Sequence, residues 1–313
     1  MKLSFQQRIT VTAVAMIITL ILIAAALWFP KTDHTVQAMD LLVVLDITQS
    51  MDVTDVELDK EQVSRLNWAK DFTKKTLVDL PCGSHVGLAV FSEYRSLILI
   101  NPVEVCANYH DLKQMISKIS GAMAWALSSE VSKASFEAIK QAKRMEPSPS
   151  IVFITDGHES PPLHKTLFAK FRGKPGEVSG VFVGVGGDDL LPIPKHDLEG
   201  NDLGVWKVDE VLHQDVYASG RGDMQEQNAL KAKTEHLSSQ KKVHIKRLAA
   251  MVGFDYLLSP ESPILLIKKL QKVSKTHDQV VNYSWAPWLA GLALIILVFL
   301  YSPFSLNRSN HQN

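Results

Sequence analysis

The chain has 313 residues, with 33 lysines and arginines against 33 aspartates and glutamates, so its formal net charge is zero. That balance excludes a nucleic-acid binder whose affinity depends on a basic face. Apolar residues make up 46% and charged residues 21% of the chain, which excludes a disordered protein.

The charges are unevenly distributed along the chain. Only three charged residues, Lys2, Arg8 and Arg308, lie in the first 30 and the last 29 residues. The central segment 31–284 therefore holds 30 basic and 33 acidic residues, a net charge of −3. We expect a slightly acidic domain between two apolar ends with basic tips.

The first apolar run covers residues 9–30, and a membrane helix needs roughly 20 such residues. Trp28 near its end fits the enrichment of aromatic residues at membrane interfaces. A cleaved secretory signal is the alternative, because Lys2 and Arg8 precede the run, but the apolar core of a signal is usually about 7–15 residues long. We expect a retained transmembrane helix after a cytoplasmic tip, residues 1–8.

The domain is predicted to begin with a buried strand. Leu41–Asp46 is a continuous apolar run that ends in an aspartate, which is typical of a strand covered on both faces. A helix is predicted at residues 62–79. Two short β-type runs follow at residues 86–91 and 95–101, and their three-residue connection predicts an antiparallel hairpin.

The two cysteines are predicted to lie at the open end of that hairpin. In a hairpin centred near position 93.5, the numbers of facing residues add up to about 187, and those of Cys82 and Cys106 add up to 188. A disulfide is therefore geometrically possible, and an oxidising periplasm would preserve it. Two reduced thiols that happen to lie close together are the alternative.

The second half of the domain continues the alternation of strands and helices. Helices are predicted at residues 129–145 and 242–252 and from Ser262-Pro263 onward, and strands at residues 150–155, 180–185 and 254–258. Gly253 suits a helix C-terminus, and Ser262-Pro263 suits a helix start. Segment 187–241 fits neither pattern and is longer than an ordinary loop, so we expect either a functional insertion or a partly mobile segment.

The second apolar run covers residues 285–304 and has aromatic residues at both ends. A transmembrane helix is predicted here, with a buried core helix as the alternative. Because basic residues stay on the cytoplasmic side, the three basic residues at the tips place both ends, including the tail 305–313, in the cytoplasm. The domain then lies outside the cytoplasm.

Apolar strands that alternate with helices predict an α/β domain over residues 40–277. We expect a doubly wound, mostly parallel sheet with one antiparallel strand at the hairpin, flanked by two transmembrane helices. The helices run antiparallel to the strands, so both tethers should leave from one edge. At about 3.3 Å per residue, the carboxyl end of the first strand lies roughly 20 Å further along and points away from the membrane.

Polar residues follow two of the predicted strands where ligands bind in doubly wound sheets, at the strands' carboxyl ends. Asp46, Thr48 and Ser50 alternate after the first strand, and Asp156 follows the strand 150–155. Two carboxylates and two hydroxyls are hard oxygen ligands, which suit Mg²⁺ or Mn²⁺ and bind soft metals poorly. The sequence therefore predicts a site for a hard cation.

The pattern Asp46-x-Thr48-x-Ser50, with Thr155-Asp156-Gly157 over a hundred residues later, resembles the metal-ion-dependent adhesion site of von Willebrand factor A (VWA) domains. The resemblance covers about residues 40–275. It implies a Rossmann-like fold and a Mg²⁺, Mn²⁺ or Ca²⁺ ion held by these residues, with one coordination position open to a partner's carboxylate. Thr48 stands where a serine is commoner, and the hydroxyl is kept.

The family's middle ligand is a threonine just before a helix, and this chain has none there. Ser129 is the best match and Ser128 is its rival. A helix N-cap is the alternative role for Ser129.

Further blocks resemble the bacterial membrane-anchored branch of the family, which implies a two-pass protein of the inner membrane with its domain in the periplasm. These blocks are residues 64–70, residues 83–88, where His85 replaces a common arginine, Ile193-Pro194 and residues 203–206. Residues 82–84 and 123–126 look most like accessory proteins of bacterial methanol oxidation.

Several other motifs compete with this interpretation. His158, Glu159 and His164 invite a zinc site, but Pro161-Pro162 would break the helix that a zinc protease needs, so solvated loop histidines are predicted. Gly184-Val185-Gly186-Gly187 is interpreted as the flexible end of a strand, and Arg221-Gly222-Asp223 as a chance match to the tripeptide that integrins read.

The expected function is metal-dependent binding of a protein rather than catalysis. By resemblance, the partner is a periplasmic or membrane protein that offers an acidic residue, with the maturation of an enzyme such as methanol dehydrogenase as the narrower role. One alternative is a metal-dependent phosphatase with Asp46 as its nucleophile, although Thr48 stands where its acid would be. The other is a general membrane VWA scaffold of the stress or aerotolerance type.

Overall fold

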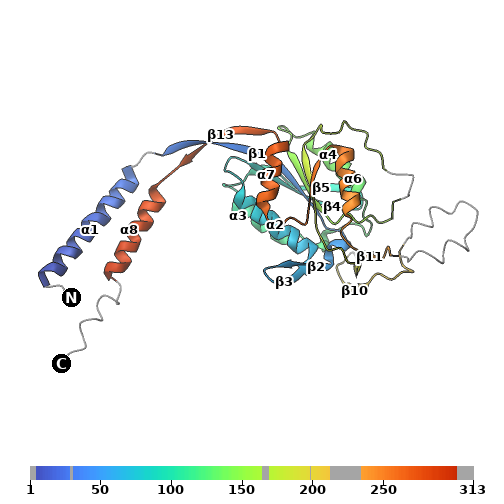
Figure 1. The fold of residues 1–313 in the computed structure, drawn as a ribbon, viewed down its shortest axis with the longest axis horizontal. Coiled ribbons are helices and arrows are strands. Elements are labelled where there is room, and N and C mark those ends of the chain that lie inside the picture. The colour runs from blue at the N-terminus through green and yellow to red at the C-terminus, as the bar shows by residue number, and fades with distance from the viewer. Residues whose placement is uncertain (1–4, 29–30, 164–168, 198, 212–233, 302–313) are drawn as a thin grey trace, which may run out of the picture. The chain divides into compact units, whose positions relative to one another are not determined.

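The computed structural model describes residues 5–28, 31–163, 169–197, 199–211 and 234–301 (Figure 1). The chain divides into two compact units. One is residues 37–279, and the other combines the flanking segments 1–36 and 280–313.

A seven-stranded sheet forms the centre of the 37–279 unit. Six strands follow the order β12-β7-β6-β1-β4-β5, and β13 pairs with β1 outside that path. Neighbours along the path are parallel, except that β5 runs antiparallel to β4. The predicted mostly parallel α/β sheet with an antiparallel hairpin strand is therefore confirmed. The strands are β1 (Thr32–Asp46), β4 (His85–Ser92), β5 (Arg95–Glu104), β6 (Ser150–Thr155), β7 (Gly180–Gly184), β12 (Asp255–Leu258) and β13 (Thr276–Tyr283).

Helices cover both faces of this sheet and create two cores. Because successive strand side chains point to opposite faces, Leu41, Val43 and Leu45 pack with α2, α3 and α7, while Leu42 and Val44 pack with α4 and α6. Burial on both faces explains why β1 reads as a continuous apolar run. The helices are α2 (Arg65–Asp79), α3 (Tyr109–Lys118), α4 (Val131–Ala142), α6 (Lys242–Val252) and α7 (Pro263–Val273), with the 3₁₀ turns η1 (Gln49–Asp52) and η2 (Gly121–Met123).

The predicted hairpin and the predicted cysteine pair are both present. Next to the turn between β4 and β5, the numbers of facing residues add up to 187, and two register shifts raise that sum to 189 at the pair His85 and Glu104. Cys82 and Cys106 lie just beyond this pair and form a disulfide with a Cα–Cα distance of 5.3 Å. The alternative of two reduced thiols is wrong for this structure.

The helix ends follow the predicted local signals in the second half of the domain. Gly253 adopts a left-handed φ of 77° and ends α6, and the Ser262 hydroxyl accepts a hydrogen bond from the backbone of Ile264 at the start of α7. Helix α2 begins later than predicted, because residues 61–64 form the strand β3 (Glu61–Ser64), which pairs with β2 (Thr54–Leu58).

Among the helices and the strands of the central sheet, α3 and β13 have no counterpart in the sequence analysis. Strand β13 consists mostly of polar residues with exposed side chains, so its sequence lacks the apolar alternation that marks a half-buried strand. The last predicted strand, residues 254–258, corresponds to β12. It is followed in the structure by β13, which pairs with β1.

The insertion 187–241 contains two short antiparallel pairs among its described residues. They are β9 (Pro194–His196) with β10 (Asp202–Val205), and β8 (Leu191–Pro192) with β11 (Leu237–Ser238). Arg221-Gly222-Asp223 lies outside the described residues.

The second unit contains two apolar helices, α1 (Phe5–Trp28) and α8 (Ala286–Tyr301), which contact each other (Figure 1). Residues 10–28 are long and apolar enough to cross a membrane, and no other helix among the described residues meets that test. The apolar α8 has 16 described residues, fewer than the roughly 20 that span a bilayer. The first predicted span is therefore present as a helix, and the second crossing stays a prediction.

Candidate metal centre

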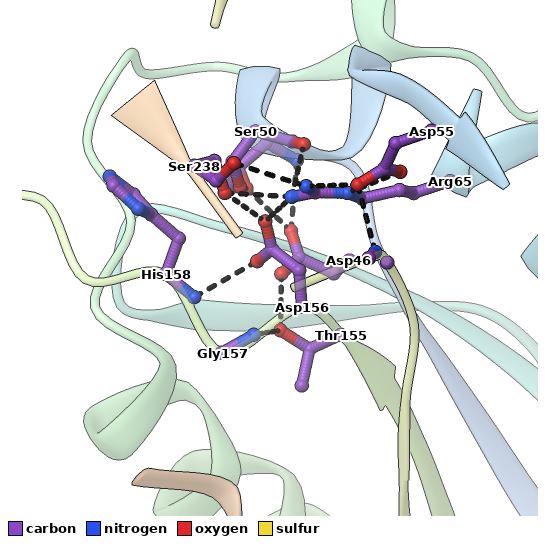
Figure 2. A network of polar contacts seen from close by, with 12 residues as sticks. Asp46, Ser50, Asp55, Arg65, Thr155, Asp156, Gly157, His158 and Ser238 are labelled. Atoms are coloured by element: carbon purple, nitrogen blue, oxygen red, sulfur yellow. Dashed lines mark hydrogen bonds and ion pairs between the residues drawn. The ribbon is translucent and has the colours of Figure 1, made fainter. Parts of the chain in front are cut away.

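Asp46 and Ser50 belong to one polar cluster at the carboxyl end of β1 (Figure 2), and Thr48 lies between them in the chain. Asp46 is fully buried, and its Oδ1 accepts hydrogen bonds from the backbone N–H of Thr48 at 3.0 Å and from its hydroxyl at 2.7 Å. The Thr48 hydroxyl lies 3.3 Å from that of Ser50. The first predicted loop thus brings its carboxylate and both hydroxyls together.

The second predicted carboxylate reaches the same cluster because β6 lies next to β1 in the sheet. Thr155, the last residue of β6, donates its hydroxyl to Asp46 Oδ2 at 2.6 Å. The next residue, Asp156, is also fully buried, and its Oδ1 accepts the backbone N–H of His158 at 2.9 Å. The parallel arrangement of β1 and β6 therefore places Asp46 and Asp156 at one edge of the sheet.

A buried arginine neutralises part of this negative charge. The Nη1 of Arg65 lies 2.6 Å from Asp156 Oδ2, and its Nε and Nη2 form a bidentate pair with Asp55 at 2.9 and 2.6 Å. The side chain of Arg65 is 0% exposed. Only a glycine leaves room for it at position 186, since a Cβ there would lie 2.7 Å from Arg65 Nε. The φ of Gly186, 111°, also favours glycine. The glycine-rich run at 184–187 therefore begins at the end of strand β7, as predicted, and its Gly186 packs against Arg65 of the site.

The two carboxylates of the site have opposite pKa shifts. Burial raises the pKa of Asp46 to about 7, and the negative charge of Asp156 acts in the same direction. Burial alone would raise the pKa of Asp156 as well, but the Arg65 guanidinium holds it below its ordinary value. In the metal-free protein Asp156 is therefore ionised at neutral pH, while Asp46 is poised to take up a proton.

The hydroxyls of the site line a cavity of about 230 Å³. Ser129 and its rival Ser128 line the same cavity as Thr48 and Ser50, so the middle residue is brought to the predicted loop. Ser129 is not the helix N-cap, a position that Glu130 occupies. Its hydroxyl donates instead to the backbone carbonyl of His158 at 2.9 Å.

His158 lines this cavity too, and the prediction that it is a solvated loop histidine is wrong. Only 3% of its surface is exposed, and burial lowers its pKa to about 4, so the imidazole is neutral at physiological pH. Its Nδ1 is buried and has no hydrogen-bond partner within the described part of the chain. The neighbouring Glu159 faces elsewhere, accepting bonds from Ser132 and lying 2.9 Å from His244. His164 lies outside the described residues.

The insertion covers the predicted metal loop. Gln49, between Thr48 and Ser50, donates its side-chain amide to the carbonyl of His196 at 2.6 Å and accepts the indole N–H of Trp206 at 2.6 Å. Residues of the insertion also line the cavity: Ile193, Trp206, Glu210, Val211 and Glu235. The described part of segment 187–241 therefore shapes the entrance to the site.

Three participants were missed by the sequence analysis as site residues: Arg65, Asp55 and Ser238. The Ser238 hydroxyl donates to Asp156 Oδ2 at 2.9 Å from strand β11 of the insertion. One signal for Arg65 was available, because a cation in the first turn of a helix opposes the helix dipole and needs another partner. Ser238 is brought to the site only by long-range pairing and leaves no local signal.

Comparison with known proteins yields one family match and several structural likenesses. Among solved structures, an aerotolerance-related membrane protein from Bacteroides fragilis NCTC 9343 has 17% identity and a TM-score of 0.48, and the likeness covers 75% of this chain and 98% of that one. BatB from Bacteroides thetaiotaomicron has 18% identity and a TM-score of 0.48 with the same coverage. An uncharacterized membrane spanning protein from Vibrio fischeri has 13% identity and a TM-score of 0.30, covering 75% and 98%. No curated protein matches the chain.

The family match falls on the segment that carries the site. Residues 41–158 match the von Willebrand factor type A domain family. This range begins in β1 and ends two residues after Asp156, so it includes each sequence-predicted member of the metal site. The chain therefore contains a von Willebrand factor type A domain.

Proposed function

We propose that this protein is a membrane-anchored factor that binds a partner protein through a divalent cation. In this proposal Asp46, Thr48, Ser50 and Asp156 hold Mg²⁺, with Ser129 as a further hydroxyl ligand. The observation that carries the proposal is that these residues gather at one edge of the sheet, where Thr48, Ser50 and Ser129 line a cavity. Carboxylate and hydroxyl oxygens are the ligands that Mg²⁺ prefers.

The charge of the site supports a divalent cation. Asp46, Asp156 and Asp55 oppose a single guanidinium, that of Arg65, so two negative charges remain uncompensated when all three carboxylates are ionised. Burying uncompensated charge is costly, and the raised pKa of Asp46 expresses that cost. A divalent cation would match this deficit of charge.

Unused hydrogen-bonding capacity of polar atoms at the site supports a bound ligand. His158 Nδ1 is buried without a partner among the described residues, and such orphaned polar atoms are rare in native proteins. Asp156 accepts bonds from His158, Arg65 and Ser238, which leaves one of the four lone-pair sites of a carboxylate available. The residues therefore fit a hard cation with a ligand above it.

The chain's own residues would orient the partner at this site. A bound cation would supply a positive charge with a position open to a partner's carboxylate. The hydroxyls of Ser128 and Ser129 line the cavity, and the Trp206 side chain is fixed by Gln49. The entrance therefore combines polar groups with an aromatic surface, which suits an acidic residue presented on a protein.

The anchoring part of the proposal is a two-pass topology in a bacterial inner membrane with the domain in the periplasm. The long apolar α1, the apolar α8 and the basic residues confined to the tips support it. The Cys82–Cys106 disulfide supports an oxidising compartment. Maturation of a periplasmic enzyme such as methanol dehydrogenase stays a prediction from short sequence blocks. The role of a general membrane scaffold of the aerotolerance type also stays a prediction.

The contacts of Asp46 disfavour the phosphatase alternative. A phosphatase of this kind needs an acid two residues after its nucleophilic aspartate. This chain has Thr48 at that position, and the Thr48 hydroxyl donates to Asp46 Oδ1. We therefore propose binding rather than catalysis.

Isothermal titration of the full-length protein in detergent with MgCl₂ tests the cation. One Mg²⁺ per chain is expected, and Asp46→Asn should abolish its binding. The matched control is Asp111→Asn, which makes the same charge change at an exposed position on α3 and should leave binding unaltered. Absence of Mg²⁺ binding in the wild-type protein would refute the metal mechanism.

Chelation tests the partner. Affinity purification from native membranes should retain a specific protein with wild type in Mg²⁺, and should lose it with EDTA and with Asp156→Ala. The disulfide and the circular dichroism spectrum of the variant check that its domain is folded. Retention of the same protein by Asp156→Ala in EDTA would exclude docking through a metal.

A further inference from the structure

A second cluster of metal-ligating side chains lies at the opposite, amino end of the central strands. Asp40 on β1 pairs in register with His85 on β4, and His277 lies on β13, which also pairs with β1. One potential ligand atom from each of the three residues lies within 4.8 Å of the other two. All three residues belong to the 37–279 unit.

The carboxylate of Asp40 lies between the two imidazoles. His85 Nδ1 is 2.9 Å from Asp40 Oδ1, and His277 Nδ1 is 4.0 Å from Asp40 Oδ2, so each oxygen faces a different ring. Ligands at about 2.0–2.2 Å from a tetrahedral Zn²⁺ are roughly 3.3–3.5 Å apart. The observed separations lie on either side of that value, and rotation of the partly exposed rings would equalise them.

The chemistry of the cluster differs from that of the Asp46 site. Two imidazole nitrogens and one carboxylate suit a borderline transition metal such as Zn²⁺, whereas carboxylates with hydroxyls suit Mg²⁺. The Asp40 side chain is 11% exposed and the two histidines are 42% and 40% exposed, so an ion can enter from solvent. Three protein ligands leave a further position for water.

We propose that Asp40, His85 and His277 form a transition-metal site that takes Zn²⁺ and fastens β13 to the sheet. Strand β13 buries little apolar surface, since most of its side chains are exposed. The Gln37 amide contacts the Asp278 carboxylate beside the cluster and provides one further link between β1 and β13. Zn²⁺ would join three strands through bonds stronger than these hydrogen bonds, at the place where the chain enters and leaves the unit.

Titration of the full-length protein in detergent with ZnCl₂, in excess Mg²⁺, tests this site. One Zn²⁺ per chain is expected. His277→Gln and His85→Gln should each weaken Zn²⁺ binding by at least about tenfold, the loss expected even for an outer hydrogen-bonding partner of a metal ligand. With Co²⁺ as a spectroscopic substitute, wild type should show the visible absorption of a nitrogen- and oxygen-ligated ion, and both variants should lose it.

Two control variants distinguish binding at this cluster from binding at a surface histidine or at the Asp46 site. His110→Gln changes an exposed histidine on α3 and should bind Zn²⁺ like wild type. Asp46→Asn should also retain Zn²⁺, because it alters only the proposed Mg²⁺ site. Absence of Zn²⁺ binding in wild type, unaltered binding in His85→Gln and His277→Gln, or an equal loss in His110→Gln would overturn the proposal.

Discussion

Replacing Arg65 by methionine tests the electrostatic account of the site most directly. Methionine is unbranched and flexible like the aliphatic part of arginine, but it carries no charge and donates no hydrogen bond. The guanidinium pairs with Asp55 and Asp156, whose side chains are 6% and 0% exposed. Arg65→Met therefore leaves two buried carboxylates without their cation.

The expected magnitude follows from the burial of the pair. Removing one partner of a buried ion pair costs about 3–5 kcal/mol, because the remaining charge is desolvated without compensation. For a domain of about 150–250 residues, each kcal/mol lowers the melting temperature by roughly 2–4 °C. We expect the melting temperature of Arg65→Met to lie about 6–20 °C below that of wild type.

Thermal unfolding of the full-length protein in detergent, followed by tryptophan fluorescence without added metal, measures this difference. Arg144→Met is the matched control, since Arg144 is exposed on the segment after α4 and its loss should shift the melting temperature little. Arg65→Lys should lie between wild type and methionine, because lysine keeps the charge but not the bidentate geometry. A shift for Arg65→Met no larger than that of the control would refute the reasoning.

Three further predictions concern pH, backbone and disulfide. Burial raises the pKa of Asp46 in the folded protein to about 7, so its ionisation makes the metal-free fold less stable as pH rises from about 4 to 7. Because Mg²⁺ binds the ionised carboxylate, the increase in melting temperature that Mg²⁺ causes should be larger at pH 8 than at pH 6. Gly186→Ala should lower the melting temperature more than Gly176→Ala, since both have positive φ but only the former places its Cβ against the buried guanidinium. Reduction of the Cys82–Cys106 disulfide, which closes a loop with a sequence separation of 24, should cost about 3–4 kcal/mol in urea unfolding, and an unchanged midpoint would contradict this.

Much of the fold was predictable because its central strands depend on local pattern. The apolar runs of β1 and β6 identify strands buried on both faces, and their carboxyl ends meet at one edge in any parallel arrangement. This is sufficient to bring Asp46 and Asp156 together from residues over a hundred positions apart. The Cys82–Cys106 pair was predictable for a similar reason, since hairpin register follows from the turn.

The remaining features depend on what packs against each residue. The sequence around His158 is typical of a polar loop, but the residue is buried. It lines a cavity together with residues of the insertion, which are distant in the sequence. Arg65 was placed within the body of a predicted helix, whereas Ser64 caps that helix and leaves Arg65 in its first turn facing the site. The polar β13 carries no periodic signal, because pairing with β1 rather than burial holds it in place.

The pairing of β13 with β1 also has a consequence for how the domain can change. Gln37 and Asp278 contact each other, so the polypeptide enters and leaves the domain at adjoining points. Adjoining ends are the condition under which domains tolerate insertion into a host chain and circular permutation. In the sequence, the domain is therefore inserted between α1 and α8, two helices that contact each other. Loops of the domain that lie away from Gln37 and Asp278 can therefore lengthen or diverge without altering the spacing of these two points.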